Sequence, residues 1–335
     1  CAGFIGFHLS KFFLEKGHKV VGLDNLSRKG SKINLEYLLK FDNFNFYNSD
    51  IRNFEDLKDI FDTHKNFQLI IHQAAQVAVT TSITNPRNDF ETNILGTFNL
   101  LEATRLYSPN AVFQYASTNK VYGEMNKLTV IKEKDRYDYK DQKKGIHENF
   151  PIDFHSPYGC SKGSADQYVR DYHRIYGLKT MVLRQSCIYG TNQYGLEEQG
   201  WIAWFIIGAI LEKKLNIYGD GFQGRDVLWI DDLVNAYEML YLNSDKTSGE
   251  IFNIGGGYKN VLSVNKLITY LDELNLLKVK PKNEEWRPGD QKIYISDITK
   301  INELTGWSPK INPKIGVEKL TEWCRNNNQL FKIYS

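Results

Sequence analysis

Short runs of β-branched and aromatic residues alternate with amphipathic stretches through the first half of the chain. The runs with strand character lie at residues 19–24, 45–49, 69–72, 112–116 and 180–184. Helical stretches lie between them, near residues 5–16, 54–64, 93–107 and 157–176. This alternation predicts an α/β fold with a doubly wound parallel sheet and helices on both faces. Right-handed crossovers then place the carboxyl ends of the strands along one ligand-binding edge.

The rhythm changes after residue 186. The later segments with helical periodicity are joined by short strands and Gly/Pro turns, and they lie at residues 201–213, 231–243, 263–274, 297–304 and 314–326. We therefore expect a nucleotide-binding domain at residues 1–185, followed by a smaller, mostly helical substrate lobe at residues 186–335. We expect the chain to return to the first domain near residues 226–254, which makes the lobe discontinuous. A hydrophobic fraction of 41% can supply the core of both parts.

A glycine turn opens the first helical stretch. The run Gly3-Phe4-Ile5-Gly6 supplies the last two glycines of a GxxGxxG turn, which lets backbone N–H groups approach a pyrophosphate. Asp24 ends the next predicted strand, where a carboxylate binds ribose hydroxyls and disfavours a 2′-phosphate. The pattern predicts a Rossmann-type domain that binds NAD, although the nearby Arg28 softens the preference over NADP. Such a domain also needs a strand before this turn, so we expect one to precede Cys1.

Tyr158 and Lys162 form the strongest chemical signal in the sequence. On a helix, positions i and i+4 share a face, so the phenol and the ammonium point into one site. Ser156 can cap this helix, and Pro157 suits its first turn. A free tyrosine titrates near 10, and a neighbouring cation favours the phenolate. Ser117 and Thr118 end a predicted strand, where a hydroxyl can bind the sugar oxygen that is oxidised.

These motifs resemble the extended short-chain dehydrogenase/reductase family over nearly the whole chain. The resemblance is carried by Gly3-x-x-Gly6, Asp24, Asp50-Ile51-Arg52, His72-Gln73-Ala74-Ala75, Asn93, Ser117-Thr118 and Tyr158-x-x-x-Lys162. It implies catalysis by Thr118, Tyr158 and Lys162 with a tightly bound NAD. The cofactor-binding positions that the motifs and the resemblance imply are Gly3, Phe4, Ile5, Gly6, Asp24, Asn25, Arg28, Asp50, Ile51, Ala74, Ala75, Gln76, Asn93, Ser117, Tyr158 and Lys162.

The branch of the family is indicated by the residues that follow Thr118. Dehydratases of the family carry Asp-Glu there, whereas this chain has Asn119-Lys120. Residues 24–30, 76–83, 117–123, 153–163 and 199–201 instead resemble the CDP-paratose 2-epimerase branch. This resemblance implies inversion at C2 of a CDP-hexose through a 2-keto sugar, a place in lipopolysaccharide O-antigen biosynthesis, and a homo-oligomer. Gln185 departs from the branch, where we expect His, and it leaves the sugar preference open.

Several further residues are expected to hold the nucleotide sugar. Arg225 and Arg287 resemble the diphosphate-binding arginines of the family, and a guanidinium fork suits phosphate oxygens. Gln199 and Trp201 are candidates for the base or the ribose, and core packing explains Trp201 almost as well. The long polar segment 124–154 is expected to border the sugar pocket. The full set of expected substrate contacts is Thr80, Thr118, Asn119, Gln199, Trp201, Arg225 and Arg287.

Two other functions compete with this interpretation. The first is another enzyme of the family, such as a UDP-hexose 4-epimerase or a nucleotide-sugar reductase. The second is a non-catalytic NAD-sensing regulator, a class that usually loses the Tyr or the Lys. A net charge of +2 argues against nucleic acid as a partner, and no apolar run reaches membrane-spanning length. The four cysteines form no CxxC pair and no metal-binding spacing, which favours a metal-free protein of the reducing cytoplasm.

Overall fold

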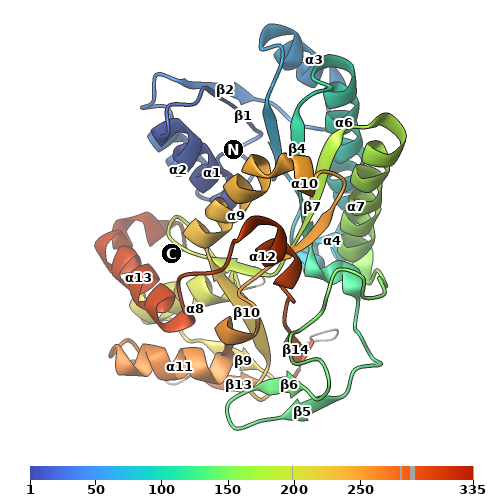
Figure 1. Cartoon of the computed structure of the whole chain (residues 1–335). Helices are drawn as coiled ribbons and strands as arrows, with labels where there is room; N and C mark the ends of the chain where they lie inside the picture. Colours follow the sequence, from blue (N-terminus) through green and yellow to red (C-terminus); the bar gives the residue numbers. More distant parts are fainter. Residues whose placement is uncertain (198, 280, 287–290, 335) are drawn as a thin grey trace.

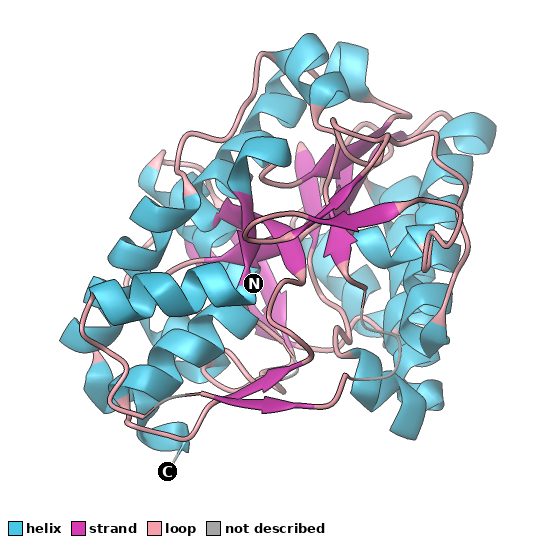
Figure 2. Cartoon of the chain, turned by 90° about the horizontal axis from the view of Figure 1, so that it is seen from below, coloured by secondary structure: helices cyan, strands magenta, loops and turns pink. Residues whose placement is uncertain are grey.

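The computed structural model describes residues 1–197, 199–279, 281–286 and 291–334. Figure 1 shows two regions: strands β1–β4 and β7 with their helices in the upper part, and the C-terminal helices with small sheets in the lower part. Seen from below, in Figure 2, helices lie on either side of the strands. This is the mixed α/β architecture that the strand–helix alternation predicts.

The central sheet is parallel throughout. Its strands, in spatial order, are β11 (Ile251–Ile254), β7 (Lys179–Gln185), β4 (Val112–Thr118) and β3 (Leu69–His72). A second parallel pair is formed by β1 (Val20–Asp24) and β2 (Phe44–Asn48). The predicted parallel sheet is therefore confirmed, whereas the strand expected ahead of the glycine turn stays a prediction.

Helices cover both faces of the central sheet because its buried strands are apolar on both sides. Met181 and Leu183 of β7 pack with α1 (Phe4–Glu15) and α9 (Ile230–Leu242) in one core. The intervening Val182 packs in the other core, which lies against the three helices on the opposite face. Those helices are α3 (Phe54–Thr63), α6 (Gly96–Tyr107) and α7 (Ser156–Tyr176).

Shorter elements connect this framework. The helix predicted at 93–107 begins instead as a π-helical turn, Glu91–Leu95, that runs into α6. A 3₁₀ turn, Asn119–Tyr122, follows β4 directly. The remaining elements of the first half are α2 (Ser31–Leu38), α4 (Val79–Thr84), α5 (Pro86–Phe90) and the hairpin strands β5 (Val130–Lys132) and β6 (Tyr137–Tyr139).

The C-terminal half contains the helices that the sequence predicts and a small mixed sheet that it does not. The sheet is built on β10 (Gly224–Trp229), which pairs with β8 (Cys187–Tyr189), β12 (Val261–Ser263) and β14 (Ile293–Tyr294). β11 leaves this half of the chain and pairs with β7 in the central sheet. The other elements are α8 (Trp201–Ile210), β9 (Asn216–Tyr218), α10 (Ser244–Thr247), the 3₁₀ turn Tyr258–Asn260, α11 (Val264–Glu273), β13 (Lys282–Glu284), α12 (Thr299–Thr305), α13 (Pro313–Asn326) and the 3₁₀ segment Asn328–Tyr334.

Within the described ranges, none of the helices is both long enough and apolar enough to traverse a bilayer.

Candidate active site

A cleft of about 710 Å³ runs along the carboxyl ends of β1, β3, β4 and β7, and it is also lined by residues 186–189, 192–195 and 199–202. It brings together most of the residues that the sequence singles out. The predicted site residues that line it are Gly3, Phe4, Ile5, Gly6, Asp24, Asn25, Arg28, Asp50, Ile51, Ala74, Ala75, Gln76, Ser117, Thr118, Asn119, Tyr158, Lys162, Gln199 and Trp201.

The start of α7 fixes Tyr158 in the cleft wall. Ser156 is the first residue of α7, with His155 at the N-cap, and not the cap that the sequence predicts; its hydroxyl still accepts a hydrogen bond from the backbone N–H of Gly159 at 3.2 Å. The N–H of Tyr158 itself donates to the Ser82 hydroxyl at 3.1 Å. Two otherwise unsatisfied donors of the first turn are thus paired, so the helix begins at a defined position. Tyr158 and Lys162 then lie one turn apart, 8% and 3% exposed.

Burial dominates the electrostatics of these two groups. It raises the pKa of Tyr158 to about 12, although a hydrogen bond with Thr118 opposes the shift. It also lowers the pKa of Lys162 to about 7, against the charges of Asp166 and Asp89. Both shifts favour the neutral form, as expected for ionisable groups that lose water. A further positive charge in the cleft would favour the Tyr158 phenolate.

The end of β4 supplies the hydroxyl groups of the site. Ser117 and Thr118 are the last two residues of the strand, and both are buried. The chain then turns into the short 3₁₀ helix, where the Thr118 hydroxyl accepts from the N–H of Lys120 at 3.3 Å. Lys162 Nζ donates to the carbonyl of Ala116 at 2.6 Å, which ties α7 to the same strand end. The catalytic candidates therefore belong to one rigid unit.

The other end of the cleft has the features of a dinucleotide site. A side-chain Cβ on Gly3 would meet no atom within 4 Å, so the backbone of the turn borders open space. A Cβ on Gly6 would lie 3.0 Å from the Cys1 backbone, so a side chain there would force that backbone to shift. Asp24 accepts from the N–H groups of Ala2 and Leu26 at 2.9 and 2.8 Å. The residues present therefore fit NAD, with the glycine turn toward its pyrophosphate and Asp24 toward its ribose.

Asp50 forms the neighbouring wall of this end. Arg52 donates to both of its carboxylate oxygens, at 2.9 and 2.8 Å, and Asn25 donates to one of them at 2.8 Å. These hydrogen bonds, that from Arg52 first, lower the pKa of Asp50 to about 2. The carboxylate is thus ionised at neutral pH, and it orders the predicted contact Asn25.

Asn93, a predicted cofactor contact, does not line the cleft. It is 1% exposed and forms a pair of hydrogen bonds with the backbone of Gln76, at 2.9 and 3.0 Å. Asp89 accepts from the side chains of Asn93 and Gln76, and Asn93 also donates to Ser161 on α7. Asn93 therefore holds the loop whose residues border the cleft, and its contact with the cofactor stays a prediction.

The expected substrate contacts are more scattered. Arg28 and Gln199 form a hydrogen bond with each other across the mouth of the cleft. Thr80 lies exposed on α4, outside the cleft lining, between the lining residues Val79 and Thr81. Arg225 also lies outside it and donates to the carbonyl of Gly224 at 2.8 Å. Arg287 lies outside the described residues, so its predicted role stays a prediction.

The segment 124–154 does not border the cleft as expected. Every one of its residues is described, and none belongs to the cleft lining. It packs instead against the small sheet, where Tyr139 donates to the carbonyl of Ile293 and Ile146 pairs with Ile295. Aromatic residues of the segment, such as Tyr139, are buried there, and this pairing over long sequence separations has no local signal in the sequence.

The structure adds the hydroxyl of Tyr237, which sequence motifs do not identify, beneath two glutamines of the cleft lining. Gln73 and Gln185 line the cleft, and both donate to the buried Tyr237 hydroxyl, at 2.5 and 2.6 Å. Gln185 is also the register partner of Thr118 on the neighbouring strand. The departure from His at Gln185 therefore lies beside the catalytic strand end, held by a residue of α9.

His72 is also buried close to the site but takes no part in the cleft. Burial and the charge of Lys162 lower its pKa to about 3. Its Nε2 lies 2.9 Å from the Thr97 hydroxyl, which donates to the carbonyl of Asn93. The imidazole is thus a neutral donor that supports the cofactor loop.

Comparison with known proteins shows the family of the chain. The family model described as GDP-mannose 4,6 dehydratase matches residues 1–320. The chain belongs to this family. It is an extended short-chain dehydrogenase/reductase, as its motifs predict.

Among curated members of the family, CDP-paratose 2-epimerase of Salmonella typhi is 42% identical over 326 residues, which cover 96% of each chain. UDP-glucose 4-epimerase of Thermotoga maritima, solved with UDP-glucose, has a TM-score of 0.84 at 33% identity and covers 98% of this chain and 97% of its own. dTDP-glucose 4,6-dehydratase of Streptomyces venezuelae, solved with NAD, has a TM-score of 0.85 at 27% identity and covers 100% and 98%. The predictions of this enzyme family and of NAD as its cofactor are confirmed.

Proposed function

We propose that the chain is an NAD-dependent nucleotide-sugar epimerase that inverts C2 of a CDP-hexose, of the CDP-paratose to CDP-tyvelose type. The observation that carries the proposal is the position of Thr118, Tyr158 and Lys162 together in the wall of one cleft that also contains the dinucleotide features. The choice of C2 and of CDP is supported by the 42% identity to CDP-paratose 2-epimerase over 96% of each chain.

Tyr158 is the general base in this mechanism. Its phenolate takes the proton of the sugar hydroxyl, and Thr118 donates to the oxygen on which negative charge develops. Bound NAD, held by the glycine turn and Asp24, would supply a reversible hydride acceptor for the sugar carbon. Tyr158 returns the proton to the new hydroxyl. The net change is inversion at one carbon with no net oxidation.

Lys162 controls the protonation of Tyr158. Burial raises the pKa of the phenol to about 12, so little phenolate forms at pH 7. Positive charge at this end of the cleft favours the phenolate, and both the Lys162 ammonium and the oxidised nicotinamide supply it. The base is therefore generated where an oxidised cofactor is in place, which limits unproductive proton removal.

The residues after Thr118 argue against dehydration. A 4,6-dehydratase needs an acid and a base to remove water, and this chain places Asn119 and Lys120 in the cleft at the two positions concerned. An amide has no proton to transfer at neutral pH, and an ammonium is a poor acid for a hydroxyl leaving group. The polar groups present suit oxidation and reduction of one secondary alcohol.

A UDP-hexose 4-epimerase is the second candidate. The same three catalytic residues can serve oxidation at C4, and the Thermotoga maritima enzyme solved with UDP-glucose covers 98% of this chain at a TM-score of 0.84. The carbon that is inverted depends on how the sugar lies against Thr118. A homo-oligomer and a place in O-antigen biosynthesis are parts of the same proposal that follow from the resemblance.

A substrate panel tests the proposal. The full-length protein is incubated separately with CDP-paratose, CDP-glucose and UDP-glucose, without added cofactor, and the sugar is followed by NMR. We expect inversion at C2 of a CDP-sugar and no inversion of UDP-glucose. Inversion of UDP-glucose at C4 would show that the protein is a UDP-hexose 4-epimerase, the second candidate. Turnover that requires added NADPH and changes the sugar's oxidation state would contradict both.

A further inference from the structure

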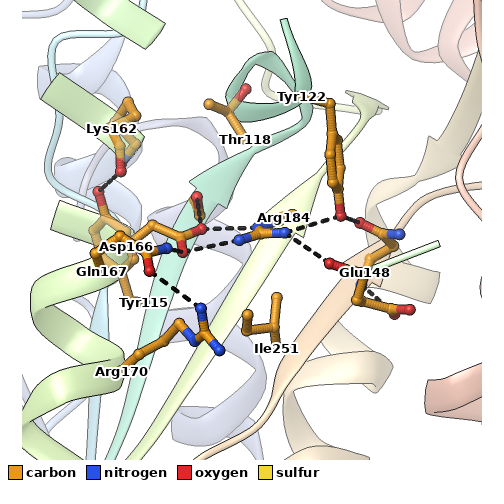
Figure 3. Close-up of polar contacts among 12 residues, drawn as sticks. Tyr115, Thr118, Tyr122, Glu148, Lys162, Asp166, Gln167, Arg170, Arg184 and Ile251 are labelled. Atoms are coloured by element: carbon orange, nitrogen blue, oxygen red, sulfur yellow. Dashed lines mark hydrogen bonds and ion pairs between the residues drawn. The ribbon is translucent and has the colours of Figure 1, made fainter. Parts of the chain in front are cut away.

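A buried ion pair lies behind the catalytic strand end. Arg184 of β7 donates to both carboxylate oxygens of Asp166 on α7, from Nε at 2.9 Å and from Nη2 at 3.1 Å. The two side chains are 1% and 0% exposed, and Figure 3 shows them side by side between the helix and the sheet. Neither lines the cleft. A charge pair buried this deeply is costly unless its remaining hydrogen bonds are satisfied, so its position calls for a reason.

On one side, the pair contacts the catalytic groups. The Ser117 hydroxyl donates to Asp166 at 2.8 Å, on the oxygen that Arg184 Nε also binds. Asp166 also follows Lys162 by one helical turn, so both side chains point toward the end of β4. Lys162 donates to the carbonyl of Ala116, the residue before Ser117. Asp166 therefore acts on both the strand and the helix that carry the site.

On the other side, the pair is anchored away from the cleft. Arg184 Nη1 donates to the Tyr122 hydroxyl at 3.1 Å and to the Glu148 carbonyl at 3.2 Å. The Tyr122 hydroxyl donates in turn to Asn253 of β11 at 2.7 Å. Figure 3 shows this row of contacts running from Asp166 through Arg184 to Tyr122 and Glu148. The guanidinium is thus held from both ends, which fixes the direction in which Asp166 presents its oxygens.

The consequence concerns the two hydroxyls at the end of β4. A serine hydroxyl has one proton, and that of Ser117 is committed to a carboxylate whose position is fixed. Toward the cleft, Ser117 can therefore only accept a hydrogen bond. Thr118 has no such carboxylate partner in the part of the chain that the structure describes. Its hydroxyl donates a long hydrogen bond, 3.5 Å, to the side-chain oxygen of Asn119 and also forms a hydrogen bond with Tyr158. The two neighbouring hydroxyls have different roles because of Asp166.

We propose that Asp166 and Arg184 are positioning residues for the epimerisation, which hold Ser117 as an acceptor and Lys162 against β4, so that Thr118 alone donates to the substrate oxygen. The inference rests on the proposed function for its reaction, but not on the identity of the sugar or of the inverted carbon.

The electrostatic part of the proposal concerns Lys162. The charged or titratable groups that interact with its ammonium are Asp166 on its own helix, Asp89 of α5, Tyr115 of β4 and His72 of β3, and Tyr158 lies one turn earlier on α7. Asp166 and Asp89 favour the ammonium, and His72 is neutral. The Tyr115 ring lies 4.3 Å from Nζ. Burial lowers the pKa of Lys162, and the negative charges of Asp166 and Asp89 act against this shift. Removal of the Asp166 charge should therefore lower the pKa of Lys162 further.

The test compares Asp166→Asn with Tyr122→Phe, which cuts the same network on the side away from the cleft. Each is assayed with whichever nucleotide sugar the wild-type protein turns over, so a wrong substrate assignment does not affect the result. For Asp166→Asn we expect kcat to fall at least about tenfold with KM within about threefold, and the alkaline limb of the kcat profile to move down by about one pH unit. For Tyr122→Phe we expect a lower melting temperature and an unchanged alkaline limb. If the alkaline limb of the kcat profile lies at the same pH in Asp166→Asn and in Tyr122→Phe, the proposal is wrong.

A second pair of variants keeps the test decisive if Asp166→Asn does not fold. Thr118→Ala removes the proposed donor, and Ser117→Ala removes the committed hydroxyl. We expect kcat to fall about 10²- to 10³-fold for Thr118→Ala and less than about tenfold for Ser117→Ala. Equal losses in the two variants would show that Ser117 also donates to the reacting oxygen, and the proposed division of roles would be wrong.

Discussion

Tyr158 and Lys162 lie one turn apart on α7, both buried, and burial shifts their pKa values in opposite directions, to about 12 for Tyr158 and about 7 for Lys162. The pKa of a tyrosine is ordinarily slightly below that of a lysine. Here the order is reversed, and Lys162 is the stronger acid of the two. Tyr158 consequently keeps its proton at neutral pH until additional positive charge in the cleft lowers its pKa.

The first prediction concerns Tyr158 itself. In Tyr158→Phe the base is lost while the ring still fills the cleft wall, so kcat should fall about 10²- to 10⁴-fold. The amount of NAD that copurifies should stay the same, as measured by absorbance after denaturation. Tyr168→Phe, at an exposed position of the same helix, should keep wild-type activity. Substantial turnover by Tyr158→Phe would show that another group removes the proton.

The second prediction concerns cofactor choice. Asp24 ends β1 beside the glycine turn, where its negative charge repels a 2′-phosphate. In Asp24→Asn the ratio of NADP to NAD retained after reconstitution with equal concentrations should rise at least about tenfold, equivalent to ~1.4 kcal/mol. Asp42→Asn, at an exposed turn before β2, serves as the control and should not change the ratio. An unchanged ratio in Asp24→Asn would mean that another residue discriminates between the ribose of NAD and the 2′-phosphate of NADP.

The third prediction uses the buried imidazole of His72. Its pKa is lowered to about 3, so the folded protein binds a proton less readily than the unfolded chain, whose histidine titrates near 6.5. The stability that depends on neutral His72 is complete above pH 6.5 and falls as pH decreases toward 3. Relative to His72→Gln, which keeps a donor for Thr97, the wild type should lose about 1 kcal/mol between pH 7.5 and 5.5.

Urea denaturation at several pH values measures this difference. His147→Gln, at an exposed position, should follow the wild type at every pH. Parallel curves for wild type and His72→Gln would show that folding does not lower the pKa of His72.

The fourth prediction concerns Tyr237. Its hydroxyl accepts from Gln73 and Gln185, so Tyr237→Phe leaves two amide donors without this partner at the floor of the cleft. The free energy of unfolding should fall by about 1–3 kcal/mol. Tyr241→Phe, one turn later on α9 and half-buried, should change it by less than about 0.5 kcal/mol. Equal effects would mean that the two glutamines find other partners.

Much of the site could be predicted because its signals are local. The glycine turn, Asp24 at a strand end, and Tyr158 with Lys162 at helical spacing each place a functional group through the geometry of one element. All of them line the cleft. Parallel strands then bring these local features to one edge without further information.

Other parts of the site depend on contacts between distant residues. Gln73 meets Tyr237 across 164 positions, and Arg184 meets Glu148 across 36. No spacing rule links such pairs. Asn93 occupies a motif position, and its side chain holds the Gln76 backbone through contacts across 17 positions. The segment 124–154 packs away from the cleft because the buried Tyr139 bonds to β14, across 154 positions.

The measurement that tests the account most directly is the fate of hydrogen at the inverted carbon. The nucleotide sugar is incubated with the protein in D₂O without added cofactor, and both epimers are examined by NMR. Internal transfer of a hydride, with Tyr158 moving only the hydroxyl proton, predicts inversion at C2 with no deuterium bound to carbon. Deuterium at C2 of the product would mean that the C–H proton exchanges with solvent, and the oxidation–reduction mechanism built on Thr118, Tyr158 and Lys162 would be wrong.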